Sequence, residues 1–425
     1  MLVKRDILDK VTLWIGEPKI LIIKGARQTG KTTLLRQLEN LLKARGDKTA
    51  YFSVDQDLDN PMYADARLFI QFLKDQRQLG AGKKLFVFLD EFQYIAKAGL
   101  FLKSVFDQHQ ADLQLIVSGS STLDIAANSE FLTGRKIDFL MTPFSFSEFL
   151  AARSEQKLPR PQSLRYGPEL ENFYRLYRVE LETKLTEFIN WGGYPEVAVE
   201  AAWDKRLAIL KDIVKTYVEK DVALFLRVEN ISGFNNVIKV LAAQTGNLVN
   251  REEISATLGL NQETVRKYLE ILAGTFIFSF VRPFFTNIRK ELSKMPKVYA
   301  ADLGIVKIVL GEALVQEYRL LSGMKVENFV FNELVKMDKV DATHFYRTIS
   351  KSEIDFIVKD ERGLWPIEAK FRVSAAKLPL AIKNFKKYYG AECQQPMVIT
   401  QQDLKQEAGA LFIPAAVWPF VKWGN

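Results

Sequence analysis

Hydrophobic residues in the first third of the chain occur in short, nearly continuous runs separated by amphipathic stretches. The runs are KILIIK (19–24), KTAYFSV (48–54), KLFVFLD (84–90), LQLIVSG (113–119) and KIDFLM (136–141). Strands buried on both faces of a parallel sheet have this composition, and the stretches between them suit crossover helices. The pattern therefore predicts an α/β domain built on a parallel sheet.

Beyond the predicted sheet the pattern changes several times. A polar, proline-bearing segment at 151–166 predicts a connection, and residues 169–228 are mostly helical in pattern apart from a turn at 192–195. Two short helices and a β-rich segment after Asn247 fit a winged helix-turn-helix, and a mixed α/β unit follows. We expect four parts, with boundaries at 1–155, 156–235, 236–295 and 296–425.

Composition narrows the classes of function. The 425 residues predict about three domains, and a net charge of +8 favours an anionic partner. A single cysteine, Cys393, excludes an intramolecular disulfide and fits a reducing cytoplasm, while His109 and His344 leave little room for a His-rich metal site. No signal peptide, membrane span or membrane partner is expected, because the N-terminal MLVKRDILDK has no apolar h-region and no apolar run reaches 18 residues.

A phosphate-binding loop follows the first hydrophobic run. The pattern G-x-x-x-x-G-K-[ST] lies between a predicted strand and a predicted helix, and it comprises Gly25, Ala26, Arg27, Gln28, Thr29, Gly30, Lys31 and Thr32, with Thr33 next. Backbone N–H groups and the helix N-terminus attract phosphate, Lys31 reaches the β and γ oxygens, and Thr32 binds Mg²⁺. ATP and Mg²⁺ are the cofactors that this loop predicts.

Polar residues end two further predicted strands. Asp90 and Glu91 follow the third run, where Asp90 would hold Mg²⁺ through water and Glu91 would polarise the attacking water. Ser118 and Ser120 end the fourth run and could sense the γ-phosphate or orient the water, although serine is also common in turns. These residues complete a predicted site for ATP hydrolysis.

At this point the chain resembles a prokaryotic family of AAA-type ATPases with a C-terminal PD-(D/E)XK nuclease-like domain. The resemblance covers nearly the whole chain and rests on GARQTGKT, the LDE ending of the third strand, SGSS, FLTGR, PFSFSEFL, GGYPE (192–196), YVEKD (217–221) and SEIDFIV…IEAKF. It implies an AAA-type P-loop core at 1–155, a helical lid at 156–235, a winged helix-turn-helix at 236–295 and a nuclease-like domain at 296–425.

The same resemblance gives Arg135 a role. In AAA-type ATPases an arginine just before the fifth strand points into the neighbouring subunit's nucleotide, and Arg135 directly precedes KIDFLM. A site completed in trans requires a ring or spiral of subunits, for which we expect a hexamer. The alternative is a surface arginine that caps a helix.

Basic residues in the predicted winged helix favour DNA as a partner. Val265, Leu269 and Leu272 repeat at helical spacing and should face the core, whereas the residues on the opposite face should be exposed to solvent. Asn261 is the expected N-cap of this helix. The candidate DNA contacts are Gln262, Arg266, Lys267, Arg282, Arg289 and Lys290, and we expect Lys294, Lys297, Phe284 and Phe285 to add to the basic, aromatic wing. A docking surface for protein is the alternative.

Carboxylates in the last unit suggest a second metal site. Asp355 and Glu368 lie in neighbouring predicted strands and could share a divalent cation, with Lys370 on the same face. The nuclease resemblance adds Glu327 or Glu333 as a further acid, although Ile354 replaces the proline of the family signature. Either the site cleaves DNA or the domain keeps the fold for DNA binding or scaffolding.

These patterns predict an oligomeric, Mg-ATP-dependent ATPase that binds DNA and couples hydrolysis to DNA translocation or remodelling. One alternative is an ATP-regulated DNA nuclease, and another is a signalling or scaffold switch that turns over ATP slowly. An intact Glu91 argues against a protein that only binds ATP. Asp355 and Lys370 keep the nuclease alternative open.

Overall fold

The chain divides by its internal contacts into two compact units in a computed structural model. The N-terminal unit is formed mainly by residues 2–143 and the C-terminal unit mainly by residues 144–425. The structure describes residues 3–76, 79, 82–119, 132–153, 159, 161–217, 228–312, 314, 317–348, 350–371 and 377–423. The expected four-part division stays a proposal, and residues 144–155 of the expected ATPase core group with the C-terminal unit.

A five-stranded parallel sheet forms the centre of the N-terminal unit. Its strand order is β2-β3-β4-β1-β5, with β1 at Ile20–Lys24, β2 at Lys48–Ser53, β3 at Leu85–Asp90, β4 at Leu113–Gly119 and β5 at Lys136–Leu140. Each strand lies within one residue of a predicted hydrophobic run. The predicted parallel α/β sheet is therefore confirmed.

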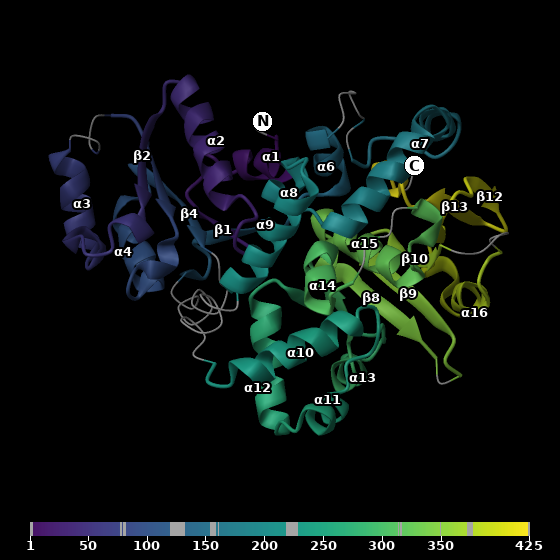
Figure 1. Cartoon of the computed structure of the whole chain (residues 1–425). Helices are drawn as coiled ribbons and strands as arrows, with labels where there is room; N and C mark the ends of the chain where they lie inside the picture. Colours follow the sequence, from purple (N-terminus) through teal and green to yellow (C-terminus); the bar gives the residue numbers. More distant parts are fainter. Residues whose placement is uncertain are drawn as a thin grey trace. The chain divides into compact units, whose positions relative to one another are not determined.

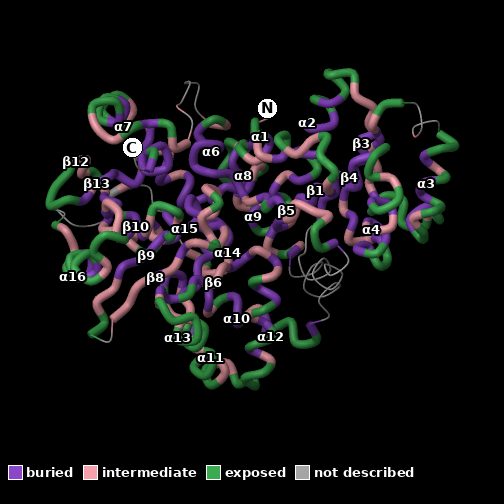
Figure 2. Tube along the Cα trace, turned by 180° about the vertical axis from the view of Figure 1, so that it is seen from behind, coloured by how far each residue is buried: buried purple, intermediate pink, exposed green. Residues whose placement is uncertain are grey.

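Helices cover both faces of this sheet (Figure 1). Helices α1 (Asp6–Thr12) and α2 (Lys31–Ala44) pack against one side of β1 through Leu21 and Ile23. Ile20 and Ile22 point to the other side, into the cluster formed with α3 (Ala66–Asp75) and α4 (Ala98–His109). Each buried aliphatic side chain contributes about 1.5–3 kcal/mol, so this alternation fixes the register of the central strand. Figure 2 shows the buried tube along β1, β3 and β4.

Helices dominate the first half of the C-terminal unit. The helical pattern predicted over 169–228 is confirmed for its described part, and the predicted turn lies between α7 and α8. The helices are α6 (Phe146–Arg153), α7 (Pro168–Trp191), α8 (Pro195–Val199), α9 (Trp203–Thr216), α10 (Ile231–Ala243), α11 (Arg251–Leu258), α12 (Gln262–Gly274), α13 (Ile288–Ser293) and α14 (Leu303–Leu310). No helix among the described residues combines the length and apolar composition needed to cross a membrane.

Two sheets complete the C-terminal unit. Strands β6 (Phe278–Val281) and β7 (Lys297–Ala300) form an antiparallel pair after α12. The second sheet has the order β12-β13-β11-β10-β9-β8, and its elements are α15 (Gly323–Lys336), β8 (Thr343–Arg347), β9 (Glu353–Asp360), β10 (Gly363–Lys370), α16 (Leu380–Tyr389), β11 (Met397–Thr400), β12 (Lys405–Glu407) and β13 (Ala410–Pro414). The winged-helix and nuclease-like assignments of these elements stay proposals.

Candidate nucleotide-binding site

The loop between β1 and α2 has a backbone that depends on its two glycines. A Cβ atom at Gly25 would lie 2.1 Å from the carbonyl oxygen of Met141, so no larger residue fits against the chain leaving β5. Gly30 has a left-handed φ of 96° and precedes the first residue of α2. The positive end of a 14-residue helix therefore opens directly onto the loop.

The Lys31 side chain forms hydrogen bonds with the backbone of the loop. Its side chain is 4% exposed, and Nζ donates to the carbonyl oxygens of Gly25 at 3.0 Å and Ala26 at 2.9 Å. The Thr29 hydroxyl also donates to the Ala26 carbonyl, at 2.9 Å. Thr32 is exposed in the first turn of the helix. A cation and a helix N-terminus lie beside the same loop, and such an arrangement fits phosphate oxygens.

Arg5 stabilises the phosphate-binding loop through hydrogen bonds, although no sequence motif includes this residue. It is 5% exposed, and its guanidinium donates to the Thr29 carbonyl oxygen at 2.8 Å and to that of Thr142 at 2.7 Å. Thr142 lies two residues after the end of β5. One rigid, bidentate side chain thus joins the phosphate-binding loop to the segment that leaves the sheet.

Asp90 ends β3 with both carboxylate oxygens engaged. The side chain is 1% exposed; its Oδ2 accepts from the Tyr51 hydroxyl at 2.8 Å, and its Oδ1 accepts from the Ser118 hydroxyl. Burial, with the adjacent Asp90 charge, raises the pKa of Tyr51, so Tyr51 stays a hydrogen-bond donor. Tyr51 is a site residue that sequence reasoning missed. The expected contact of Ser118 with a γ-phosphate stays a prediction.

Glu91 follows Asp90 in a constrained conformation. Its φ of 55° is left-handed, which is uncommon for a residue with a Cβ atom, and its N–H donates to the Ser118 hydroxyl at 3.3 Å. The Gln93 amide donates to its carboxylate. Glu91 is therefore held at both its backbone N–H and its carboxylate. Ser120, the other expected serine, lies outside the described residues.

Arg135 lies one residue before β5, as the resemblance implies. Its guanidinium forms a two-point ion pair with Asp107 of α4, with Nε–Oδ1 at 2.6 Å and Nη2–Oδ2 at 3.2 Å. This hydrogen bonding holds the pKa of Asp107 below its usual value. Arg135 thus has a partner within its own chain, and its action on a neighbouring subunit stays a prediction.

Helix α12 presents a polar face with a different charge from the one expected. Asn261 caps the helix, accepting the Thr264 N–H at 2.9 Å. Val265 and Leu272 are buried as predicted, Leu269 is only half-buried, and Tyr268 is buried beside them. Gln262, Arg266 and Lys267 are exposed.

The exposed face of α12 is not simply basic, which corrects the sequence expectation. Arg266 forms ion pairs with Glu263 and with Glu270, the latter at 3.0 Å. These acids lie three and four residues away on the helix, the spacing at which side chains meet. The charge of Arg266 is therefore balanced within the helix before any partner binds.

The residues after β6 differ from one another in exposure. Arg282, Arg289 and Lys290 are exposed, with the latter two in the first turn of α13, where Asn287 is the N-cap. Phe284 is buried. The expectation that Lys297 adds to a basic wing is wrong, because this lysine is buried and ion-paired with carboxylates.

The structure brings the expected carboxylates of β9 and β10 together. The Asp355 carboxylate accepts the Ala369 N–H at 2.8 Å, and the Glu368 carboxylate accepts the Asp355 N–H at 3.1 Å. Lys370 pairs with Glu368. Burial and the neighbouring Glu327 and Glu368 raise the pKa of Asp355. Among the described residues, no group of three or more His, Cys, Asp or Glu side chains has an arrangement that could hold a metal ion.

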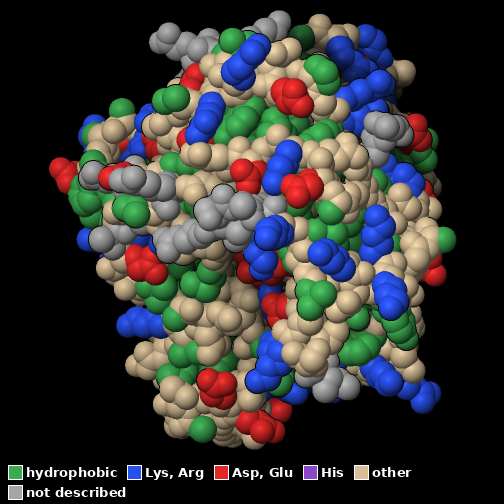
Figure 3. Space-filling view, turned by 90° about the vertical axis from the view of Figure 1, so that its right-hand side faces the viewer, with side chains coloured by type: hydrophobic (Ala, Val, Ile, Leu, Met, Phe, Trp, Pro, Cys, Tyr) green, Lys and Arg blue, Asp and Glu red, His purple; other side chains and the backbone are tan. Residues whose placement is uncertain are grey.

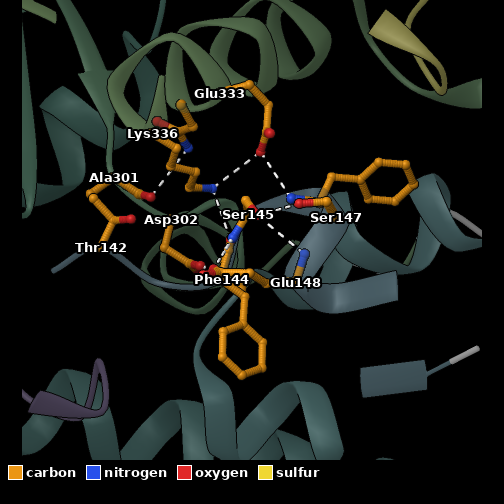
Figure 4. A network of polar contacts seen from close by, with 12 residues as sticks. Thr142, Phe144, Ser145, Ser147, Glu148, Ala301, Asp302, Glu333 and Lys336 are labelled. Atoms are coloured by element: carbon orange, nitrogen blue, oxygen red, sulfur yellow. Dashed lines mark hydrogen bonds and ion pairs between the residues drawn. The ribbon is translucent and has the colours of Figure 1, made fainter. Parts of the chain in front are cut away.

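Glu333, by contrast, belongs to a different buried network (Figure 4). Its carboxylate accepts the Phe146 N–H at 3.0 Å and pairs with Lys336 at 3.3 Å, and Lys336 donates to the Phe144 carbonyl oxygen at 2.8 Å. Glu333 therefore holds the start of α6, and it does not join Asp355. This placement corrects its expected role as a metal-binding acid.

Asp302 explains why the GGYPE segment needs its glycines. Its carboxylate accepts the N–H groups of Gly193 at 2.7 Å and Ile305 at 3.1 Å, so it caps α14 as well. A Cβ atom at Gly192 would lie 2.0 Å from that carboxylate. The Phe144 N–H donates to the Gly193 carbonyl oxygen at 2.7 Å. The resemblance named the glycines, but no sequence signal identified Asp302.

Family models match three consecutive segments of the chain. Residues 17–150 match the model described as AAA domain, residues 182–314 match Domain of unknown function (DUF8612), and residues 322–418 match Domain of unknown function (DUF4143). The chain therefore carries an AAA domain on the five-stranded sheet. Neither of the other models shows a winged helix or a PD-(D/E)XK nuclease domain.

Two proteins similar to most of this chain come from bacteria. The chain is 23% identical over 383 residues to an uncharacterized protein of Haemophilus influenzae, covering 88% of each. It is 22% identical over 360 residues to the uncharacterized protein Rv2008c of Mycobacterium tuberculosis, covering 84% of this chain and 71% of that protein. A solved structure of Aeropyrum pernix Orc1 with DNA aligns over 76% of this chain and 96% of its own, at 14% identity and a TM-score of 0.31.

Proposed function

We propose that the protein is an oligomeric, Mg-ATP-dependent ATPase that acts on DNA. The observation that supports this most strongly is the loop of Gly25–Thr32, in which Lys31 lies over the loop carbonyls at the N-terminus of α2. The match of residues 17–150 to an AAA domain supports the same conclusion. A cytoplasmic location is part of the proposal and rests on the single cysteine.

Four residues divide the work in this proposal. Lys31 and the N–H groups of the loop hold the phosphates, and Thr32 with Asp90 would hold Mg²⁺, which offsets phosphate charge. The hydrogen bonds from Tyr51 and Ser118 keep Asp90 oriented. Glu91 would accept the proton of the attacking water.

DNA binding and self-association are two further parts of the proposal. Exposed Lys267, Arg289 and Lys290 and the net charge of +8 favour an anionic partner. Figure 3 shows many Lys and Arg side chains on one face, but with Asp and Glu between them. We therefore place the contact on phosphates and propose no base specificity. Arg135 would complete the site of a neighbouring subunit in a ring or spiral, which we propose to be a hexamer.

Two alternative functions require different properties of the protein. An ATP-regulated DNA nuclease needs the carboxylates of Asp355 and Glu368 to bind a divalent metal. A slow signalling or scaffold switch needs only ATP binding and a change of assembly. Glu91 in its constrained turn favours hydrolysis over a switch.

The test compares Lys31→Ala with Glu91→Gln. We expect Lys31→Ala to abolish ATP binding, and Glu91→Gln to bind ATP normally while turnover falls by about 10²–10⁴-fold, because a general base contributes on that order. Binding is measured with a fluorescent ATP analogue, and turnover by phosphate release with and without duplex, single-stranded and branched DNA.

Glu171→Gln, an exposed position on α7, serves as the matched control and should behave as wild type. Equal loss of ATP binding in Lys31→Ala and Glu91→Gln would contradict the role given to Glu91. Turnover that no DNA form changes would leave an ATPase but remove DNA from the proposal.

A further inference from the structure

A buried lysine lies among the carboxylates where a divalent cation was expected. Lys297 of β7 is 3% exposed. Its Nζ lies 2.6 Å from Glu353 Oε1, 2.9 Å from Glu327 Oε1 and 3.9 Å from Asp355 Oδ1. The three acids come from α15 and β9, whereas Lys297 comes from the hairpin before them. We call Glu327, Glu353, Asp355 and Lys297 the lysine cluster.

The backbone fixes where this lysine enters the cluster. Lys297 pairs with Val281 of β6 on one side and with Leu248 on the other. The next residue, Val298, donates its N–H to the Asn247 carbonyl oxygen at 3.1 Å and accepts the Gly246 N–H at 2.7 Å. Pairing on both edges fixes the backbone of this strand and therefore the side of the strand on which each side chain begins. The position of Lys297 next to the carboxylates is therefore set by the backbone of β7.

The carboxylate oxygens are already occupied by donors. Glu327 Oε1 accepts from the Tyr299 hydroxyl at 2.8 Å as well as from Lys297. Asp355 and Glu368 each accept a backbone N–H, and Lys370 pairs with Glu368. A divalent ion needs several oxygens turned toward one point at about 2.0–2.6 Å. These residues do not fit a metal, since an ammonium group already lies among the acids.

The charges of the cluster support the same view. Burial disfavours a charged lysine, but the carboxylate oxygens of Glu353 at 2.6 Å and Glu327 at 2.9 Å from Nζ stabilise the ammonium form. Lys297 therefore stays protonated. Removing the lysine would leave the buried Asp355 without this nearby ammonium group, and a buried charge without compensation is costly in a low-dielectric interior.

We infer that the Lys297 ammonium is the built-in cation of the lysine cluster, where it takes the place of a divalent metal and ties the β6–β7 hairpin to the terminal sheet. This goes beyond the ATPase proposal and is independent of it. It also predicts that the wild-type cluster does not serve a metal-dependent nuclease, and that loss of Lys297 opens a divalent-cation site.

The test is Mn²⁺ binding to the nucleotide-free full chain, followed by electron paramagnetic resonance. We expect Lys297→Ala to bind about one further Mn²⁺ per chain compared with wild type, because Glu327 and Asp355 then lose this ammonium group and Glu353 keeps only its ion pair with Arg347. The double variant Lys297→Ala/Asp355→Asn should lose that ion. Lys294→Ala, an exposed lysine on the same segment, should bind Mn²⁺ as wild type does.

Further variants test the inference if circular dichroism shows that Lys297→Ala does not fold. Lys297→Met/Glu353→Gln removes one charge of each sign and should still gain the ion. Wild type and Asp355→Asn should bind Mn²⁺ equally, whatever the other variants do. Weaker Mn²⁺ binding by Asp355→Asn than by wild type, or a folded Lys297 variant that gains no Mn²⁺, would overturn the inference.

Discussion

Lys307 shows at the scale of one residue how burial changes a charge. This lysine of α14 is 6% exposed, its Nζ lies 4.4 Å from the centre of the Trp191 ring, and it has no hydrogen-bond partner among the residues that the structure describes. Burial, with a smaller contribution from Lys325, lowers the pKa of Lys307 to about 8. The aromatic contact therefore only partly compensates for the loss of hydration.

The sign of the resulting pH dependence follows from proton binding. Between pH 8 and the ordinary lysine pKa of 10.5, the unfolded chain holds this proton more tightly than the native protein does. The contribution of Lys307 to the free energy of unfolding therefore becomes more favourable as the pH rises from 8 to 10.5. Below pH 8 both states are protonated, and the full cost of the buried charge is present.

We expect Lys307→Met to raise the thermal midpoint at pH 7 by roughly 2–4 °C for about 1 kcal/mol of relieved burial. The difference from wild type should shrink as pH rises from 8 to 10. Thermal denaturation followed by circular dichroism at several pH values measures both effects. Lys239→Met, at an exposed position on α10, should give no such pH-dependent difference. A Lys307→Met midpoint below that of wild type at pH 7 would contradict the expectation.

At the scale of an element, α12 shows that a helix face can be polar without being basic. Spacing correctly predicted that Arg266 and Lys267 face outward. Acids placed one turn away, Glu263 and Glu270, share the same face. DNA binding by this helix would thus have to compete with intrahelical ion pairs, which are each worth only a few tenths of a kcal/mol.

Two opposite changes on α12 test this prediction. Arg266→Glu with Lys267→Glu should weaken DNA binding and flatten the plot of log K against log salt, by roughly one unit for each phosphate that the protein no longer neutralises. Glu263→Gln with Glu270→Gln should strengthen binding, because Arg266 is then free to reach phosphate. Fluorescence anisotropy with labelled duplex at several salt concentrations gives both quantities.

Lys205→Glu with Lys211→Glu, at two exposed positions on α9, controls for the change in net charge. If this α9 variant lowers affinity as much as the Arg266 and Lys267 variant does, DNA does not bind on α12. If none of these changes alters DNA affinity, α12 is better explained as a protein docking surface.

At the scale of the whole molecule, Arg135 decides whether one subunit needs another. The arginine pairs with Asp107 of its own chain, so its loss could act through that pair or through a neighbour. Mixing Arg135→Ala with Lys31→Ala should restore ATP turnover, since each variant supplies the group that the other lacks. Turnover is measured as a function of the mixing ratio.

Asp107→Asn separates the two explanations, because it removes the ion pair and keeps the arginine. We expect Asp107→Asn to hydrolyse ATP at nearly the wild-type rate while Arg135→Ala is impaired. Equal impairment of the two, with no rescue on mixing, would assign Arg135 a role within its own chain.

Local pattern alone determined the sheet and the loop of the N-terminal unit. Strands buried on both faces need continuous apolar runs, and a phosphate-binding turn needs glycine at Gly25 and Gly30 and lysine at Lys31. The apolar runs and the spacing of the loop motif involve only neighbouring residues, so the sequence shows them directly, although the contact that requires glycine at Gly25 comes from the distant Met141. The pair Asp90–Glu91 could be placed for the same reason, because it ends an apolar run.

Only the tertiary structure decided which polar groups meet. Tyr51 on Asp90, Arg5 behind the loop and Lys297 among the carboxylates involve partners from 24 to 137 residues apart. A single charged or hydroxyl side chain has no periodicity that reveals its partner. Glu333 was misplaced because α15 could turn either of its acids toward β9, and packing of its apolar face selected Glu327. These groups become neighbours only when the chain folds, so the packing of the apolar residues determines which polar groups pair with one another.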